Sequence, residues 1–250
     1  MALFDRFSNS DNSEMTFIDH LEVLRGTIVR SLSAVLIASL VLFIYRDWIM
    51  DNVITGPINP DFITYRAFCQ LSHFLHLGDS LCMPPVKVSM QSTTFGGQFL
   101  SSISMAFVGG IIVAFPFVFY QIWAFIKPAL KEKELNNTRF MIFWVSFFFF
   151  LGAAFGFFVL GPFTFNFLAS FQLGTKNIIT TTPTFSDYLD NLTNLILGCG
   201  IAFEMPVIVF LLTKVGIITP KFLSAKRKYA VVIILVVSAF ITPSPDWYSQ

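Results

Sequence analysis

The sequence predicts an all-α, polytopic membrane protein, and three observations support this fold class. Of the 250 residues, 55% are hydrophobic and only 12% are charged, and the mean hydropathy is +0.71. A soluble domain normally carries about 25% charged residues. The apolar residues also gather in runs of about 20, the length that a helix needs to cross a bilayer. We therefore expect a single membrane domain over residues 1–250.

Five apolar stretches separated by polar connections are the candidate spanning helices. They are residues 26–45, 99–126, 140–168, 193–213 and 229–242. The last stretch, YAVVIILVVSAFI, is short for a hydrocarbon core about 30 Å thick, because a helix rises about 1.5 Å per residue. We expect the bilayer to thin near this helix, which costs little free energy.

The distribution of basic residues predicts the orientation in the membrane. Of the sixteen lysines and arginines, twelve lie near the N-terminus or in the second and fourth connections. The other four are Arg46, Arg66, Lys87 and Lys176. Because cytoplasmic loops retain basic residues, we expect a cytoplasmic N-terminus and external connections at 46–98 and 169–192. The preceding segment MTFIDHLEVLRGTIVR is amphipathic and is expected to lie at the cytoplasmic surface.

Two cysteines lie in the first external connection, in the stretch CQLSHFLHLGDSLC. Cys69, His73, His76 and Cys82 offer four zinc ligands, but their spacing lacks the paired knuckles of structural zinc sites. In an oxidising compartment, a disulfide that closes this short loop stabilises the fold by about 3 kcal/mol. We therefore favour a Cys69–Cys82 disulfide, with zinc as the alternative, and we expect no resident metal or cofactor.

Small residues and prolines favour a curved bundle. Gly152 and Gly156 have the four-residue spacing that lets two helices approach closely, and we expect them to pack within this chain. Pro116 and Pro206 each remove a backbone donor from a spanning helix. The resulting bends favour a bundle with a concave face.

Glu204 is the one acidic residue within the five apolar stretches. An enzyme that works inside the membrane needs a nucleophile with its base, a pair of acids or a set of metal ligands in its spans, and the sequence offers none. We therefore predict that the protein is not an enzyme. A carboxylate in hydrocarbon is costly, so we expect Glu204 to be neutral and to make a polar contact. A proton-coupled small-molecule transporter that uses Glu204 as its proton carrier is the alternative function.

Four stretches together resemble the TatC subunits of the twin-arginine protein translocase. They are FIDHLEVLR, FPFVFYQIWAFIKPALKEKE, CGIAFEMPVIVFLLTKVGIITP and ITPSPDWYSQ. The resemblance implies a membrane receptor that binds the twin-arginine signal peptides of folded cargo and recruits TatA- and TatB-type single-span proteins. It also implies contacts with other copies of the chain and with membrane lipid, transport driven by the proton-motive force, and a place in the cytoplasmic (inner) membrane. Nucleic acid is not an expected partner.

The resemblance also implies roles for particular residues. Glu134 matches the loop glutamate that receives the arginine pair, and Phe125 and Pro128 shape that site. A carboxylate there accepts a bidentate guanidinium, a geometry that lysine does not match. Glu204, two residues before Pro206, matches an intramembrane glutamate on the concave face, where a partner helix docks. Asp246 belongs to the outer turn after the fifth helix.

Two features depart from the family pattern, one residue and the number of helices. Val23 stands where the family has a glutamate directly before Leu-Arg, and Glu22 precedes it. Glu22 is therefore a second candidate for binding the signal peptide, turned by about 100° on the helix. Family members have six spanning helices, so we expect residues 1–250 to lack the final one.

Overall fold

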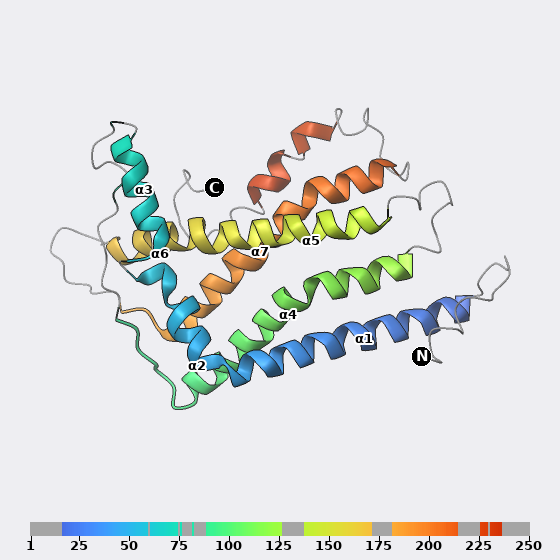
Figure 1. The fold of residues 1–250 in the computed structure, drawn as a ribbon, viewed down its shortest axis with the longest axis horizontal. Coiled ribbons are helices and arrows are strands. Elements are labelled where there is room, and N and C mark those ends of the chain that lie inside the picture. The colour runs from blue at the N-terminus through green and yellow to red at the C-terminus, as the bar shows by residue number, and fades with distance from the viewer. Residues whose placement is uncertain are drawn as a thin grey trace.

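The long helices α1 (Phe17–Ile44), α4 (Gly97–Ile126) and α7 (Phe185–Lys214) lie close together at one end of the molecule and diverge toward the start of α1, and α7 crosses α5 (Thr138–Phe155) (Figure 1). The structure is a computed structural model, and it describes residues 17–59, 61–74, 76, 82, 89–126, 138–171, 182–214, 226–229 and 231–236. Among these residues, four helices are long and apolar enough to cross a membrane. They are His20–Ile44, Gly97–Ile126, Met141–Ser170 and Phe185–Thr213.

The first helix, α1, runs without a break over Phe17–Ile44. The amphipathic segment at its start was expected to lie on the membrane surface, but it continues directly into the spanning helix. No proline interrupts this stretch, and Gly26 is compatible with a helix. α1 packs mainly against α4 (Gly97–Ile126), which passes through Pro116 and remains helical on both sides of it.

The third span combines three helical segments, α5 (Thr138–Phe155), a π-helical turn (Gly156–Leu160) and α6 (Gly161–Ser170). The π-helical turn directly precedes Gly161-Pro162. Proline has no backbone N–H, so the regular hydrogen-bond ladder is disturbed there and a π-turn is one way to accommodate it. The span is therefore continuous, as the apolar stretch predicted.

The fourth span, α7 (Phe185–Lys214), begins eight residues before the apolar stretch predicted at 193–213. The Thr184 hydroxyl accepts a hydrogen bond of 3.1 Å from the Asp187 backbone N–H, which caps the helix. Tyr188, Leu189 and Leu192 then pack with Met105 and Phe165 in a buried cluster. The acidic residues in the first turns lower the hydropathy of this segment. The apolar pattern therefore does not indicate where the helix begins.

Close packing of α5 against α7 depends on two glycines. A Cβ atom on Gly152 would lie 2.5 Å from the carbonyl oxygen of Cys199, and one on Gly156 would lie 2.6 Å from that of Leu195. Phe149 also contacts Gly200 across the same interface. The prediction that Gly152 and Gly156 pack within this chain is confirmed.

Replacing Gly152 with alanine is expected to destabilise the protein by about 2 kcal/mol, because the added methyl group forces α5 and α7 apart. Gly26→Ala is the matched control, since a Cβ atom on Gly26 meets nothing within 4 Å. That control should be neutral or slightly stabilising, because alanine favours the helix over glycine. Thermal unfolding of both variants in detergent measures the difference, and equal midpoints would contradict the proposed role of the glycine contact.

Short helices form the end of the molecule opposite the start of α1 (Figure 1). They are α2 (Arg46–Ile49), a π-helical turn (Met50–Ile54), a 3-10 turn (Gly56–Ile58) and α3 (Ile63–Phe74). The Tyr65 hydroxyl lies 2.8 Å from the Pro57 carbonyl oxygen and 3.2 Å from that of Pro162. The hydroxyl groups of Thr64 and Tyr188 donate to the carbonyls of Phe158 and Ile54. These hydrogen bonds hold the connection at 46–98 against the spanning helices.

Cys69 and Cys82 form a disulfide in this connection, and Cys199 is a buried free cysteine. His73 Nε2 lies 4.0 Å from the sulfur of Cys82. Oxidised sulfurs do not serve as thiolate ligands, so the arrangement agrees with the favoured disulfide rather than with the zinc alternative.

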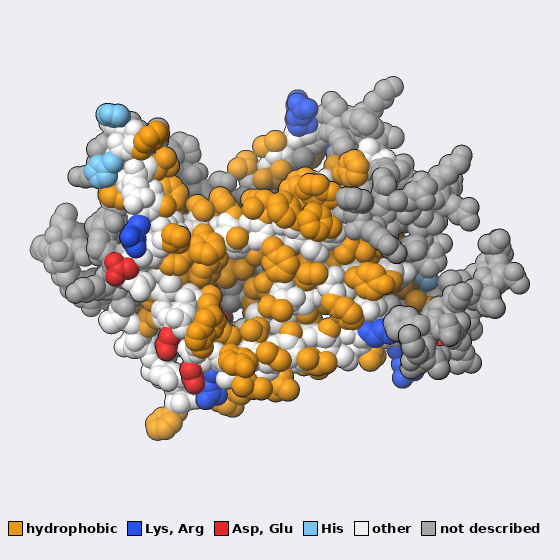
Figure 2. Space-filling model, in the orientation of Figure 1, with side chains coloured by type: hydrophobic (Ala, Val, Ile, Leu, Met, Phe, Trp, Pro, Cys, Tyr) orange, Lys and Arg blue, Asp and Glu red, His pale blue; other side chains and the backbone are white. Residues whose placement is uncertain are grey.

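Apolar side chains cover the long helices, and the Lys, Arg, Asp and Glu side chains visible in Figure 2 lie toward the ends of these helices or outside them. Large exposed apolar residues occur along α1, α4, α5 and α7. This distribution is that of a protein whose helices face lipid. The fifth predicted span, 229–242, is described only in part. Residues 226–229 and 231–236 are helical, and the prediction of five spans stays a prediction.

Candidate functional site

Two of the predicted signal-peptide residues lie at the end of the molecule where α1 begins and α4 ends. Phe125, in the last turn of α4, is half-buried against His20 in the first turn of α1. Their rings stack with centroids 4.3 Å apart and planes inclined by 24°. Glu22 is exposed on α1, two residues after His20. This contact joins the start of α1 to the end of α4.

Glu134, Pro128 and Asp246 lie outside the described residues. Pro128 and Glu134 belong to the connection that follows Ile126, the last residue of α4. Phe125 lies one residue before the end of α4, close to the point where this connection begins. The sequence reasoning assigned no role to His20, because the contact joins residues more than 100 positions apart and no local pattern predicts it.

Glu204 lies in α7 and is only 6% exposed. It follows Gly200 by one helical turn, and Gly200 contacts the Phe149 ring, so Glu204 lies on the side of α7 that faces α5. Its Oε1 atom is buried and has no hydrogen-bond partner in the described part of the chain. Leaving such a group unpaired costs about 1–3 kcal/mol. A hydrogen bond from another group to Oε1 would remove this cost. The prediction that Glu204 faces a concave surface stays a prediction.

An exposed face of α7 borders this buried carboxyl group. Met205 and Pro206 directly follow Glu204 and are exposed, and Ile201 and Ile208 are exposed one turn to either side. Pro206 has no backbone N–H, so the carbonyl of Ala202 lacks its usual helical donor. An apolar face with an unused carbonyl beside a buried acid is a surface on which another helix can pack and form hydrogen bonds.

Three other polar atoms resemble Glu204 Oε1 in being buried without a hydrogen-bond partner among the described residues. They are Ser31 Oγ, Trp123 Nε1 and Ser146 Oγ. Trp123 is 5% exposed and lies in α4, two residues before Phe125. Sequence reasoning did not select these residues, because serine and tryptophan in an apolar helix give no sign of whether their polar atoms find a partner.

The described helices define the class of protein, an all-α, multi-pass membrane protein with one buried acid in its spans. The family model of the Sec-independent protein translocase protein (TatC) matches residues 19–250. The chain therefore belongs to the TatC family, whose members are translocase subunits and not enzymes.

Individual relatives agree with this assignment. The chain is 36% identical over 237 residues to the TatC protein of Blattabacterium sp. subsp. Periplaneta americana (strain BPLAN), covering 94% of this chain and 88% of the relative. It is 30% identical over 240 residues to that of Carboxydothermus hydrogenoformans, covering 96% and 87%. A crystal structure of TatC in the detergent DDM, described as the twin arginine translocase receptor, superposes with a TM-score of 0.70 at 28% identity. That match covers 92% of this chain and 91% of the crystallised one.

Proposed function

We propose that this protein is the receptor and core subunit of a twin-arginine translocase in the cytoplasmic membrane, with its N-terminus in the cytoplasm. It binds the twin-arginine signal peptides of folded proteins through the connection that carries Glu134, with Phe125, Pro128 and Glu22 around the site. Membership in a family of translocase subunits supports this proposal. The similar crystal structure, described as the twin arginine translocase receptor, supports the receptor role.

The observation that carries the proposal is the stacking of His20 on Phe125. It holds the start of α1 and the end of α4 together, next to the point where the connection with Glu134 begins. An arginine pair entering there meets Glu22 from α1 and the carboxylate of Glu134 from the connection. Two carboxylates suit two guanidinium groups, since each charge-assisted pair is stronger than a neutral hydrogen bond.

The same proposal assigns the exposed face of α7 to partner recruitment. Single-span proteins of the TatA and TatB type pack against Met205 and Ile208, and a polar group of the partner reaches Glu204. The unpaired Oε1 atom supports this assignment, because a partner's hydrogen bond would offset its cost. Other copies of the chain are further partners, and transport draws on the proton-motive force.

Binding of a fluorescent signal peptide to the purified protein tests the receptor proposal. Replacing the two arginines of the peptide with two lysines keeps its charge but removes the bidentate geometry, so affinity should fall about tenfold. A peptide with two glutamines should bind more weakly still. Equal affinity of the arginine and lysine peptides would contradict a site built for guanidinium groups.

A further inference from the structure

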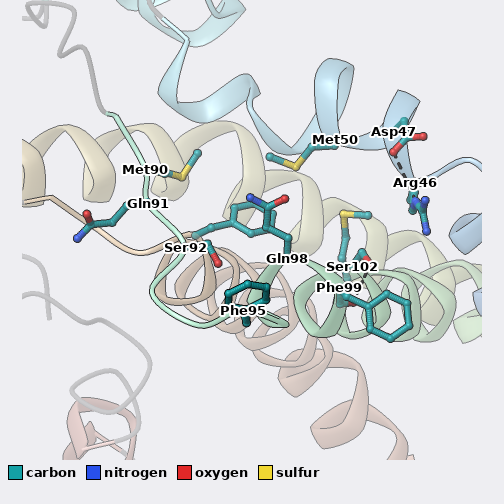
Figure 3. A pocket seen from close by; sticks show the side chains of 12 residues that line it. Arg46, Asp47, Met50, Met90, Gln91, Ser92, Phe95, Gln98, Phe99 and Ser102 are labelled. Atoms are coloured by element: carbon teal, nitrogen blue, oxygen red, sulfur yellow. Dashed lines mark hydrogen bonds and ion pairs between the residues drawn. The ribbon is translucent and has the colours of Figure 1, made fainter.

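A cavity of about 630 Å³ opens at the end of the molecule opposite the His20–Phe125 contact (Figure 3). Its wall comes from α2, from the segment 90–95, from the first turns of α4 and from the first residue of α7. The volume lies within the range of about 300–1,000 Å³ that is usual for small-molecule sites. None of the roles proposed above uses this cavity.

The polar side of the cavity carries one positive and one negative charge. Arg46 and Asp47 begin α2, and Arg46 Nε lies 3.5 Å from Asp47 Oδ1. Both side chains reach solvent, since they are 43% and 90% exposed. The guanidinium has further N–H donors besides Nε. Figure 3 shows Gln98 and Ser102 of α4 on the same wall, and their side chains add an amide and a hydroxyl group.

The rest of the wall combines the polar side chains of Gln91 and Ser92 with thioethers and aromatic rings. Met50 and Met105 contribute thioethers, and Phe95 and Phe99 contribute aromatic rings. Phe95 is fully exposed and Phe99 is 59% exposed. Exposed rings of this kind have an apolar environment only if lipid or a ligand covers them. Methionine side chains are flexible, so such a wall adapts to an alkyl chain.

The cavity lies beside the ends of two candidate spans, where the membrane interface is expected. Arg46 comes two residues after Ile44, where the first span ends, and Gly97 begins the second span. Tyr45 and Trp48 are exposed beside it. Tyrosine and tryptophan concentrate where the hydrocarbon meets the headgroups. A molecule in this cavity would therefore place one end among headgroups and the other among acyl chains.

The wall is held in place by backbone hydrogen bonds. The Gln91 N–H donates to the Pro183 carbonyl at 3.2 Å, and the Phe185 N–H donates to the Gln91 carbonyl at 3.0 Å. These bonds fix the segment that carries Met90 and Ser92 against the start of α7. This part of the wall is therefore ordered by backbone hydrogen bonds, which lowers the entropic cost of binding against it.

We propose that this cavity binds one zwitterionic aminophospholipid, with its phosphate on Arg46, its ammonium group on Asp47 and an acyl chain along Met50, Phe99 and Met105. A phosphoethanolamine headgroup carries a negative and a positive charge a few atoms apart, which matches the Arg46–Asp47 pair. An anionic lipid such as phosphatidylglycerol has no positive group to pair with Asp47, and its phosphate would lie beside this carboxylate. Choline keeps the positive charge but has no N–H to donate, so phosphatidylcholine lacks the charge-assisted hydrogen bond to Asp47.

Native mass spectrometry of the purified protein tests the proposal with lipids of identical acyl chains. We expect wild-type protein to retain one phosphatidylethanolamine about tenfold more strongly than phosphatidylcholine or phosphatidylglycerol. Arg46→Gln should weaken this binding about tenfold, and Asp47→Asn should remove the preference for ethanolamine over choline. The matched controls are Arg66→Gln and Asp61→Asn, which alter exposed charges outside the cavity and should bind as wild type does.

A second measurement needs no variant. A photoactivatable phosphatidylethanolamine should label peptides that contain Met50 or Met105, and unlabelled phosphatidylethanolamine should compete. Soluble glycerophosphoethanolamine should not compete, because it lacks the acyl chains. Equal retention of the three lipids, unchanged binding by Arg46→Gln in a folded protein, or competition by the soluble headgroup would each overturn the proposal.

Discussion

Replacing Glu134 with arginine is expected to abolish binding of a twin-arginine signal peptide while the protein still inserts into the membrane. In the proposed site, the change replaces a carboxylate that would accept guanidinium groups with a positive charge that would repel them. Affinity should fall by about 100-fold or more, because a charge-assisted pair is lost and a like-charge contact replaces it. Glu134→Gln removes the charge but keeps an acceptor, so about a tenfold loss is expected. Titration of the labelled peptide against each purified variant measures both effects.

Glu132→Arg is the matched control, since it makes the same charge change two residues away in the same connection. It should weaken binding only slightly, through long-range repulsion that salt screens. Unchanged affinity in Glu134→Arg, or equal losses in Glu132→Arg and Glu134→Arg, would show that the connection attracts the peptide only by its overall charge. The receptor site would then lie elsewhere.

Replacing Glu204 with alanine is expected to stop export of a folded twin-arginine reporter almost completely, whereas Glu204→Gln should retain much of it. The carboxyl group is buried and one oxygen is unpaired, so a partner's polar group is expected to bond there. Glutamine has nearly the same shape as a neutral glutamic acid and can still donate and accept. Alanine removes both abilities and leaves the partner's group unpaired in hydrocarbon, where this is costly.

The alternative function, a proton-coupled transporter, leads to a different result. Glutamine cannot release and rebind a proton, so a proton carrier at this position would fail equally as Gln and as Ala. Crosslinking from residue 204 to a single-span partner is the second readout. Equal and complete loss of export in both variants, with the crosslinks intact, would favour proton chemistry over docking. Phe210→Ala, which alters an exposed side chain of the same helix outside the proposed docking face, controls for general damage to α7.

The sequence predicted the fold class and the approximate position of the four long helices, because runs of apolar residues determine both. It misplaced the start of α7, since Asp187 and Asp190 interrupt the apolar pattern although the Thr184 cap and the burial of Tyr188 favour a helix there. It also separated the amphipathic start of α1 from the span. Amphipathicity describes which faces are apolar and does not show whether two adjoining helical segments are collinear.

Only one part of the candidate site could be predicted from the sequence, because an acidic residue within an apolar span is rare. A single acid in an apolar stretch is conspicuous, and Glu204 was selected for that reason. The stacking of His20 on Phe125 and the cavity beside Arg46 depend on residues brought together from distant segments. Neither the stacking contact nor the cavity follows from the spacing of its residues in the sequence. Both become visible only in the folded structure.

The unbroken course of α1 has a mechanical consequence. With 28 residues it is about 40 Å long, and it carries His20 near one end while Arg46 follows closely after the other. A continuous helix without a kink does not bend locally when one of its ends is tilted. If binding at the proposed receptor site displaced the end of α1 that carries His20, the opposite end would move as well, and the cavity beside Arg46 would change shape. The helix would then act as a lever joining the two faces of the membrane.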